Sequence, residues 1–413
     1  MLSITREEAR PLDWIAERQA AMTETVMAWS AINSGSRNLA GLDRMATALE
    51  QAFGALGPVR LVAPEPVSAP DNDGCLQPLP HGRIFHLTVR PEARHRVLLA
   101  GHMDTVFAAD HPFQAPRWRE PGVLNGPGVA DMKGGLLVML HALLALEQSP
   151  WAGGLGYEVV INADEEVSSL GSAALLAAAA RRADIGLVYE PALPDGRLAG
   201  ARKGIGTYAV LAQGRAAHAG RNPEAGRNAV LAVADLFVRL ARLPRVRDGL
   251  TVNVASLGGG GPTNVVPAQA VGRFEVRCWS HEDRHWAQAQ VAAIVAEVAG
   301  HHDVSLTVHG GFNRPPKPLD AVQAGLFEAV RGCGADLGLA VDWAPSGGCC
   351  DGNNLAAQGL PVVDSLGVRG GAIHSAEEFL IVDSMTERAR LSALLLMRLA
   401  SGALAWPARG PRP

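Results

Sequence analysis

Hydrophobic and polar positions follow two different patterns along this chain. Short runs such as 96–104 (RVLLAGHMD) are apolar at consecutive positions, which is typical of a central strand covered on both faces. Longer runs such as 133–147 (KGGLLVMLHALLALE) have the length of a buried helix. Strand-like and helix-like runs alternate up to about residue 190 and return near the C-terminus. This alternation predicts an α/β fold with a sheet between layers of helices.

The order of elements changes after Pro194-Asp195-Gly196. From there the pattern predicts strand, helix, strand, strand, helix and strand. These elements cover 203–213, 228–243, 250–258, 269–280, 283–299 and 303–311. The order is typical of a ferredoxin-like α+β sandwich. We therefore expect residues 199–313 to form a second domain, inserted between the segments 1–198 and 314–413 of the first.

The remaining segments complete the first domain. Two amphipathic helices are expected between residues 12 and 56, and a polar, proline-rich connection at 64–82. Helical patterns at 320–334 and 383–403 close the chain. Nowhere do about 18 apolar residues run together, so no transmembrane span is expected. The charged N-terminus also lacks the apolar core of a signal peptide.

Composition narrows the class of protein. The chain has 413 residues, 48% hydrophobic and 19% charged, which suits a compact protein of two domains. Its net charge of −4 does not favour nucleic acid or an anionic membrane as a partner. Five cysteines without CxxC spacing indicate reduced thiols and a cytoplasmic location.

Imidazole and carboxylate side chains gather at or just beyond the C-terminal ends of the expected strands. They are His102, Asp104, Asp131, Glu165, Glu166 and Glu190. A further histidine, His374, follows the apolar run 360–367. One such residue alone is more often a helix cap or a surface charge, but ligand sites form at this edge of open α/β sheets. Nitrogen and oxygen ligands without thiolates suit zinc, with cobalt or manganese as substitutes.

The spacing of these residues suggests different tasks. Asp104 lies two residues beyond His102, so in extended backbone it faces the same side and can orient the imidazole. Asp131 lies in a glycine-rich turn before a helix, where it could bridge two cations or cap the helix. Adjacent carboxylates such as Glu165 and Glu166 repel each other unless a cation lies nearby. If Glu166 binds metal, Glu165 is free to transfer protons; the alternative is an exposed acidic strand end.

Five short strings carry a family resemblance: GHMDTV, GPGVADMKGG, DEE, YEP and IHSAEE. In this order they resemble the signatures of the di-zinc metallopeptidase family 20, from about residue 95 to 380. Within that family the chain is most similar to the bacterial glutamate carboxypeptidase type, and more loosely to acetylornithine deacetylase and succinyl-diaminopimelate desuccinylase. The resemblance implies a zinc-exopeptidase-like α/β/α catalytic domain with an inserted ferredoxin-like α+β lid and dimerisation domain.

The resemblance also implies two zinc ions per subunit. In the family pattern one ion is held by His102 and Glu190, the other by Glu166 and His374, and both by Asp131. Glu165 is then the general base, taking a proton from a water that bridges the metals, and Asp104 orients His102. A cis peptide bond is implied between Asp131 and Met132.

In the second domain the resemblance implies residues that meet the substrate. His218, within HAGRNPEAGRNA, matches a histidine that reaches the site of the partner subunit, which implies a homodimer. Asn264, Arg277 and Arg314 match positions that hold the carboxylate end of the substrate, as a guanidinium fork can. Without the family pattern, the histidine and each arginine would be interpreted as surface residues.

These expectations describe a metal-dependent hydrolase that releases an amino acid from an amide. The first hypothesis is a glutamate carboxypeptidase-like enzyme. The second is an N-acyl-amino-acid amidohydrolase, a deacetylase or desuccinylase, or a dipeptidase, acting by the same chemistry. A third, an inactive amino-acid-binding relative, is disfavoured by the intact Glu165 and ligand positions. The expected partner is a small peptide or N-acyl amino acid, with neither nucleic acid nor membrane.

Overall fold

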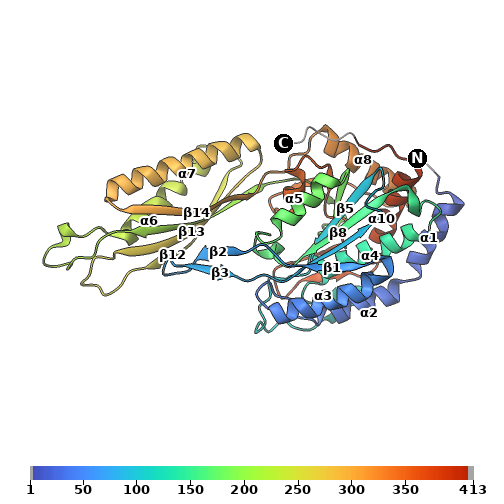
Figure 1. Ribbon diagram of the computed structural model, residues 1–413, viewed down its shortest axis with the longest axis horizontal. Helices are drawn as coiled ribbons and strands as arrows, with labels where there is room; N and C mark the ends of the chain where they lie inside the picture. The colour runs from blue at the N-terminus through green and yellow to red at the C-terminus, as the bar shows by residue number, and fades with distance from the viewer. Residues whose placement is uncertain (1–2, 408–413) are drawn as a thin grey trace.

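The computed structural model of the protein describes residues 3–407 and has two lobes (Figure 1). The larger lobe is built on a six-stranded sheet in the order β1-β4-β8-β5-β9-β16. Its strands are β1 (Val59–Val62), β4 (Ile84–Val89), β8 (Gly156–Asn162), β5 (Arg96–His102), β9 (Ile185–Val188) and β16 (Val362–Val363). From β8 to β16 the strands run parallel, whereas β1 and β4 pair antiparallel. The expected α/β architecture is confirmed.

Helices cover both faces of this sheet. Alternate residues of β5 enter two cores: Val97 and Leu99 pack into the larger, Leu98 and Ala100 into the smaller. The larger core is closed by α1 (Arg6–Ala16), α2 (Gln19–Ser30), α3 (Leu39–Phe53), α4 (Gly134–Glu147), α8 (Ala321–Asp336) and α10 (Ser384–Ser401). The smaller is closed by α5 (Ala173–Arg182) and α9 (Asp351–Ala356). Burial on both faces explains why these strands are apolar throughout.

The smaller lobe is a four-stranded antiparallel sheet covered by two helices on one face (Figure 1). Along the chain its elements are β11 (Gly204–Gln213), α6 (Ala229–Leu240), β12 (Thr251–Gly259), β13 (Gln269–Cys278), α7 (His281–His302) and β14 (Ser305–Arg314). The strand order β12-β13-β11-β14 is that of the ferredoxin-like sandwich. Tyr208, Val210 and Ala212 alternate along β11 into the core beneath the helices.

Short strands complete the structure. β6 (Arg117–Glu120), β7 (Val123–Asn125), β17 (Gly370–Gly371) and β18 (Phe379–Ile381) form a small sheet, and β10 (Leu198–Arg202) pairs with β15 (Trp343–Ser346). β2 (Val67–Pro70) and β3 (Leu76–Leu79) form a hairpin that extends to the smaller lobe (Figure 1). There Arg273 donates to Pro70 O and to Asn72 Oδ1.

Two local expectations differ from the structure. The N-terminal segment forms three helices rather than two, because the chain turns between α1 and α2 at Glu17 and Arg18. The proline-rich stretch 64–82 contains the hairpin β2-β3 instead of a plain connection.

Among residues 3–407 one segment, Val129–Glu147, is long and apolar enough to span a membrane. However, 89% of an apolar 18-residue stretch within this segment is buried inside the protein. It contains the core helix α4.

A buried ion cluster joins the two lobes at their connections. Arg202, at the end of β10, and Lys317, just after β14, both contact the Asp364 carboxylate at 3.0 Å. Lys317 also donates to Gly200 O at 2.8 Å. The Asp364 and Lys317 side chains are 0% exposed. One carboxylate beyond β16 therefore fixes both chain segments that lead to the smaller lobe.

Removing this carboxylate is expected to destabilise the protein strongly. Asp364→Ala leaves two cationic groups without their partner, and breaking a buried pair in this way costs about 3–5 kcal/mol. The control is Asp43→Ala, which breaks the Arg83–Asp43 pair, 48% and 57% exposed; it should cost at most about 1 kcal/mol. Urea unfolding followed by circular dichroism measures both. Equal losses in the two variants would contradict the anchoring role of Asp364.

Candidate metal centre

Three neighbouring parallel strands carry the candidate ligands to one edge of the large sheet. His102 is the last residue of β5, and Glu165 and Glu166 follow β8 in a single helical turn, Glu165–Val167. Glu190 follows β9. Because β8, β5 and β9 are adjacent and parallel, their carboxyl ends meet at the same edge. Sheet topology alone therefore brings these segments together.

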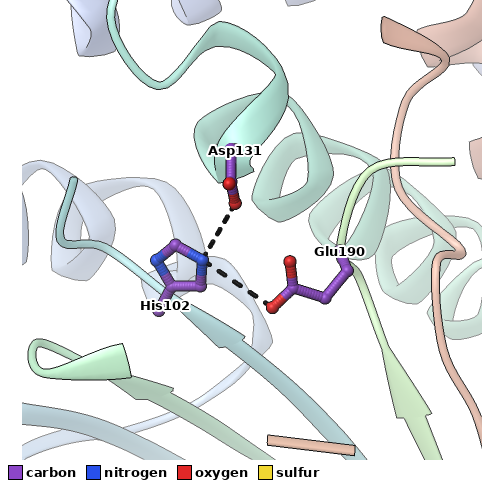
Figure 2. A group of neighbouring side chains, drawn as sticks. All are labelled: His102, Asp131 and Glu190. Atoms are coloured by element: carbon purple, nitrogen blue, oxygen red, sulfur yellow. Dashed lines mark hydrogen bonds and ion pairs between the residues drawn. The ribbon is translucent and has the colours of Figure 1, made fainter. Parts of the chain in front are cut away.

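The side chains form two groups that share one carboxylate. In the first, His102 Nε2 lies 3.1 Å from Asp131 Oδ1 and 3.8 Å from Glu190 Oε1 (Figure 2). In the second, His374 Nε2 lies 3.3 Å from Asp131 Oδ2 and 3.1 Å from Glu166 Oε2. Within each group the possible ligand atoms lie within 4.8 Å of one another. The grouping is the one that the family resemblance implied.

Asp104 supports the segments at the ends of β5 and β8. Its backbone oxygen lies 3.0 Å from His102 Nδ1 and its Oδ1 3.4 Å away, which fixes the ring and leaves Nε2 toward the cluster. The same carboxylate accepts hydrogen bonds from the backbone N–H groups of Glu165 and Glu166, at 3.1 and 3.2 Å. Ser36 donates a further bond at 2.8 Å. Asp104 therefore orients two ligand-bearing segments, of which the sequence indicated only one.

Asp131 comes from the loop before α4, and its bond to Met132 is cis, as expected. The buried Glu378 carboxylate accepts three backbone hydrogen bonds from this loop. The sequence pattern assigns no role to Glu378, although this residue lies four positions beyond His374 in the string IHSAEE. Its position close to His374 in the sequence is the signal that could have identified it.

Glu165 is held by Arg314. The guanidinium Nη2 lies 2.9 Å from Glu165 Oε1 and donates to the backbone oxygen of Glu165 at 2.6 Å. Ser169 accepts a further bond at 2.9 Å. Both charged side chains are buried, at 7% and 8% exposed. In this conformation Arg314 therefore orients Glu165 rather than facing open solvent.

The electrostatics of the cluster fit divalent cations. Burial, with repulsion from Asp131, raises the pKa of Glu190 to about 8 and also raises the pKa of Glu166. Hydrogen bonds to Asp131 and Glu166 raise the pKa of His374 to about 11. Carboxyl groups with pKa values raised in this way are stabilised by nearby positive charge, which a divalent cation can supply. Imidazole and carboxylate ligands without a thiolate are the set that zinc and similar ions accept.

A cavity of about 840 Å³ opens beside the cluster, between the two lobes. Asp131, Glu165, Glu166, Glu190 and His374 lie in its wall together with residues of the smaller lobe. Its other charged lining residues are Arg202, Glu275, Arg277 and Arg314. Each of these arginines has a carboxylate partner; Arg277 Nε, for example, lies 2.8 Å from Glu275 Oε1.

Cys349 also lines the cavity, whereas Cys350 is buried. The Cys350 sulfur accepts a hydrogen bond from the N–H of Gly352 at the start of α9. All five cysteines of the chain are free.

Two of the expected substrate residues lie away from this cavity. His218 and Asn264 are exposed on the smaller lobe and are not among the residues that line the cavity. They are neighbours, since Ala219 N donates to Asn264 O at 2.9 Å and His218 bridges to Val265. The structure therefore groups the site residues in two places: one set around the cavity and one pair on the smaller lobe.

An α/β/α domain with a ferredoxin-like insertion and a carboxylate–imidazole cluster at the sheet edge defines a metal-dependent hydrolase. Residues 98–398 match the model of peptidase family M20/M25/M40, and the chain belongs to this family. It is 32% identical over 315 residues to carboxypeptidase G2 of Pseudomonas sp. (strain RS-16), covering 74% of each protein. It is 30% identical over 328 residues to succinyl-diaminopimelate desuccinylase of Rhodospirillum centenum, covering 74% of this chain and 81% of the relative.

Solved structures agree with the fold. The chain is similar to a tripeptidase from Staphylococcus aureus with a TM-score of 0.71 at 22% identity, over 93% of this chain and 99% of the other. Together with the family match, the fold identifies an enzyme that hydrolyses amide bonds with the help of a divalent metal.

Because Asp131 belongs to both groups of side chains, its loss should affect metal binding more than the loss of any other candidate ligand. With one ion bound in each group, Asp131→Ala should lose nearly all of the bound metal, whereas His374→Ala should retain about half of it. Inductively coupled plasma mass spectrometry of purified protein measures this content. The control is His218→Ala, because His218 is exposed and lies away from the cluster. An Asp131→Ala protein that keeps the wild-type metal content would contradict the shared-ligand arrangement.

Proposed function

We propose that this enzyme is a two-zinc carboxypeptidase of the glutamate carboxypeptidase type, releasing a C-terminal amino acid from a small peptide or N-acyl amino acid. The observation that carries the proposal is the pair of ligand groups sharing Asp131, with Glu165 close by but in neither group. A carboxylate beside the metals and free of them is what a hydrolase needs for proton transfer. The 32% identity to carboxypeptidase G2 supports the choice of reaction.

The residues present can hold two cations per subunit. His102 and Glu190 serve one, Glu166 and His374 serve the other, and Asp131 serves both. We favour Zn²⁺, with Co²⁺ or Mn²⁺ as substitutes, because these ions accept imidazole nitrogen together with carboxylate oxygen. When bound, such a pair of cations polarises the scissile carbonyl and lowers the pKa of a water molecule toward neutrality.

Glu165 transfers the proton. Its carboxylate takes a proton from the attacking water and then gives it to the leaving amine, so that the amide nitrogen departs as a free amino group. Two contacts keep Glu165 in place for both steps: Arg314 at its carboxylate and Asp104 at its backbone N–H. Burial raises the pKa of Glu165, although the Arg314 cation opposes this effect. A carboxyl group with a raised pKa is suited to receive a proton near neutral pH.

Arg314 and Arg277 bind the carboxylate end of the substrate, and Asn264, which lies outside the cavity of its own chain, joins them from the partner subunit. Arg277 and Arg314 line the cavity, and a guanidinium donates two parallel hydrogen bonds to a carboxylate. Arg314 already holds one carboxylate, that of Glu165. Its Nε atom is buried without a hydrogen-bond partner, so the guanidinium has a donor left for a second acceptor.

The active assembly is a homodimer in which His218 acts across subunits. His218 and Asn264 lie outside the cavity of their own chain, on the exposed side of the smaller lobe. The same lobe exposes Leu231, Val238 and Val254, which a partner subunit can cover. His218 then donates a hydrogen bond to the oxyanion that forms on the substrate carbonyl. Residues 199–313 form the lid and dimerisation domain in this proposal, between catalytic segments 1–198 and 314–413.

An N-acyl-amino-acid amidohydrolase, a deacetylase or desuccinylase, is the second candidate. The 30% identity to a succinyl-diaminopimelate desuccinylase favours it. Both candidates use the same residues and differ in what occupies the acyl side of the cavity. A cytoplasmic location accords with either, since all five cysteines are free thiols.

A substrate panel distinguishes these candidates. Metal-replete enzyme is assayed with folate-like glutamates, dipeptides and N-acetyl or N-succinyl amino acids, and release of free amine is measured. A carboxypeptidase should prefer the first two groups by kcat/KM and should lose activity when the C-terminal carboxylate is amidated. A preference for acetyl or succinyl substrates would select the second candidate instead.

Glu165→Gln should lower kcat by about 10²–10⁴-fold, because the amide side chain cannot accept the proton. Metal content should remain at the wild-type level, since Glu165 belongs to neither ligand group. Steady-state kinetics and metal analysis of the same preparation provide the two measurements. Unchanged turnover in this variant would rule out the proposed proton transfer.

Mixing two inactive variants tests whether His218 acts across subunits. Glu165→Gln and His218→Asn proteins should each be nearly inactive as homodimers. After subunits are exchanged, mixed dimers contain one site with an intact Glu165 and an intact partner His218, so activity should return. Recovery is measured against unmixed samples at the same total concentration. If no activity returns although mass spectrometry detects mixed dimers, His218 does not act from the partner subunit.

A further inference from the structure

Glu378 is a buried carboxylate that belongs to neither ligand group. It lies in the connection between β17 and β18, four residues beyond His374, and it is 1% exposed. The proposed proton transfers and the substrate contacts do not use it. A carboxylate that is buried to this extent needs hydrogen bonds to compensate for the lost contact with water. The donors of these hydrogen bonds therefore indicate what Glu378 does.

All three partners of the Glu378 carboxylate are backbone N–H groups of one loop. Oε1 accepts hydrogen bonds from Ala130 and Asp131, both at 3.0 Å, and Oε2 accepts one from Gly128 at 3.1 Å. The loop is held at its beginning by the same residue, because the Asn125 side chain donates to the backbone oxygen of Glu378 at 2.7 Å. Glu378 therefore contacts both the beginning and the end of the segment 125–131, whose last residue is the shared Asp131.

We propose that Glu378 is a positioning residue for the metal centre, whose carboxylate fixes the loop 128–131 so that Asp131 faces both ligand groups. This inference rests on the proposed role of Asp131 as a shared ligand. Three hydrogen bonds that converge on one carboxylate define the position and direction of a short loop. Since His374 lies on the same β17–β18 connection, this segment both carries one ligand and orients another.

A different explanation is that Glu378 acts only through its negative charge, which would attract cations whatever the loop does. Glutamine separates the two explanations. Its amide oxygen can still accept from Ala130 and Asp131, but its NH₂ group faces the Gly128 N–H and the charge is lost. Alanine loses the charge and all three hydrogen bonds. A positioning role predicts an intermediate effect for glutamine, whereas a role of charge alone predicts equal effects.

The experiment measures metal binding rather than turnover. Full-length wild type, Glu378→Gln and Glu378→Ala are stripped of metal and titrated with Zn²⁺ by calorimetry and with Co²⁺ by visible absorption. Glu378→Ala should bind about 10–100-fold more weakly, the usual effect of losing a group that orients a ligand, and Glu378→Gln should lose less. The Co²⁺ spectrum should change in both variants, because it reports ligand geometry. Glu377→Gln is the matched control, since Glu377 is the exposed neighbour.

Two results would overturn the proposal: wild-type affinity and spectrum in Glu378→Ala, or equal losses in the glutamine and alanine variants. If the alanine variant does not fold, the glutamine variant decides, and an unaltered Co²⁺ spectrum there also overturns it. A wild-type enzyme that binds neither Zn²⁺ nor Co²⁺ would contradict the proposed function itself. Wild-type binding with unaffected Glu378 variants would contradict the positioning role alone.

Discussion

Repulsion among buried carboxylates at one edge of the large sheet is the constraint on which the rest of the structure depends. Asp131, Glu165 and Glu190 are buried and Glu166 is half-buried, and all four line the same cavity, where burial limits their screening by water. Burial and then this repulsion raise the pKa of both Glu166 and Glu190, since a bound proton removes part of the charge. Divalent cations offset it better, because one ion contacts several carboxylates at once. The cluster is therefore built to bind metal rather than to stabilise the fold.

Such a cluster must be held from outside, and two further carboxylates do this through the backbone. Asp104 accepts N–H groups from the segment after β8, and Glu378 accepts them from the loop that carries Asp131. Both carboxylates accept hydrogen bonds from main-chain donors, and Asp104 accepts one more from the Ser36 hydroxyl. Rigid backbone lets the ligand side chains remain close together despite their repulsion.

The smaller lobe contributes to the same cavity from the other side. Arg314, at the end of β14, lies on Glu165, and Arg277 on β13 lines the wall. The chain segments that connect the lobes are anchored on Asp364, beyond the end of β16. A few buried ion pairs thus couple the orientation of the smaller lobe to the geometry of Glu165. Because these pairs are buried, they are strong only while their geometry is maintained.

Sequence patterns are enough to predict the alternation of strands and helices, the ferredoxin-like insertion and the set of candidate ligands. These follow from local periodicity and from short motifs, which need no knowledge of distant contacts. Three features become visible only in the folded chain: Glu378 supports Asp131, Asp364 joins Arg202 to Lys317, and the hairpin β2-β3 reaches the smaller lobe. The physical reason is separation along the chain. Partners more than 100 residues apart, such as Asp131 and Glu378, leave no periodic signal, and a lone acidic residue resembles any surface charge until folding buries it.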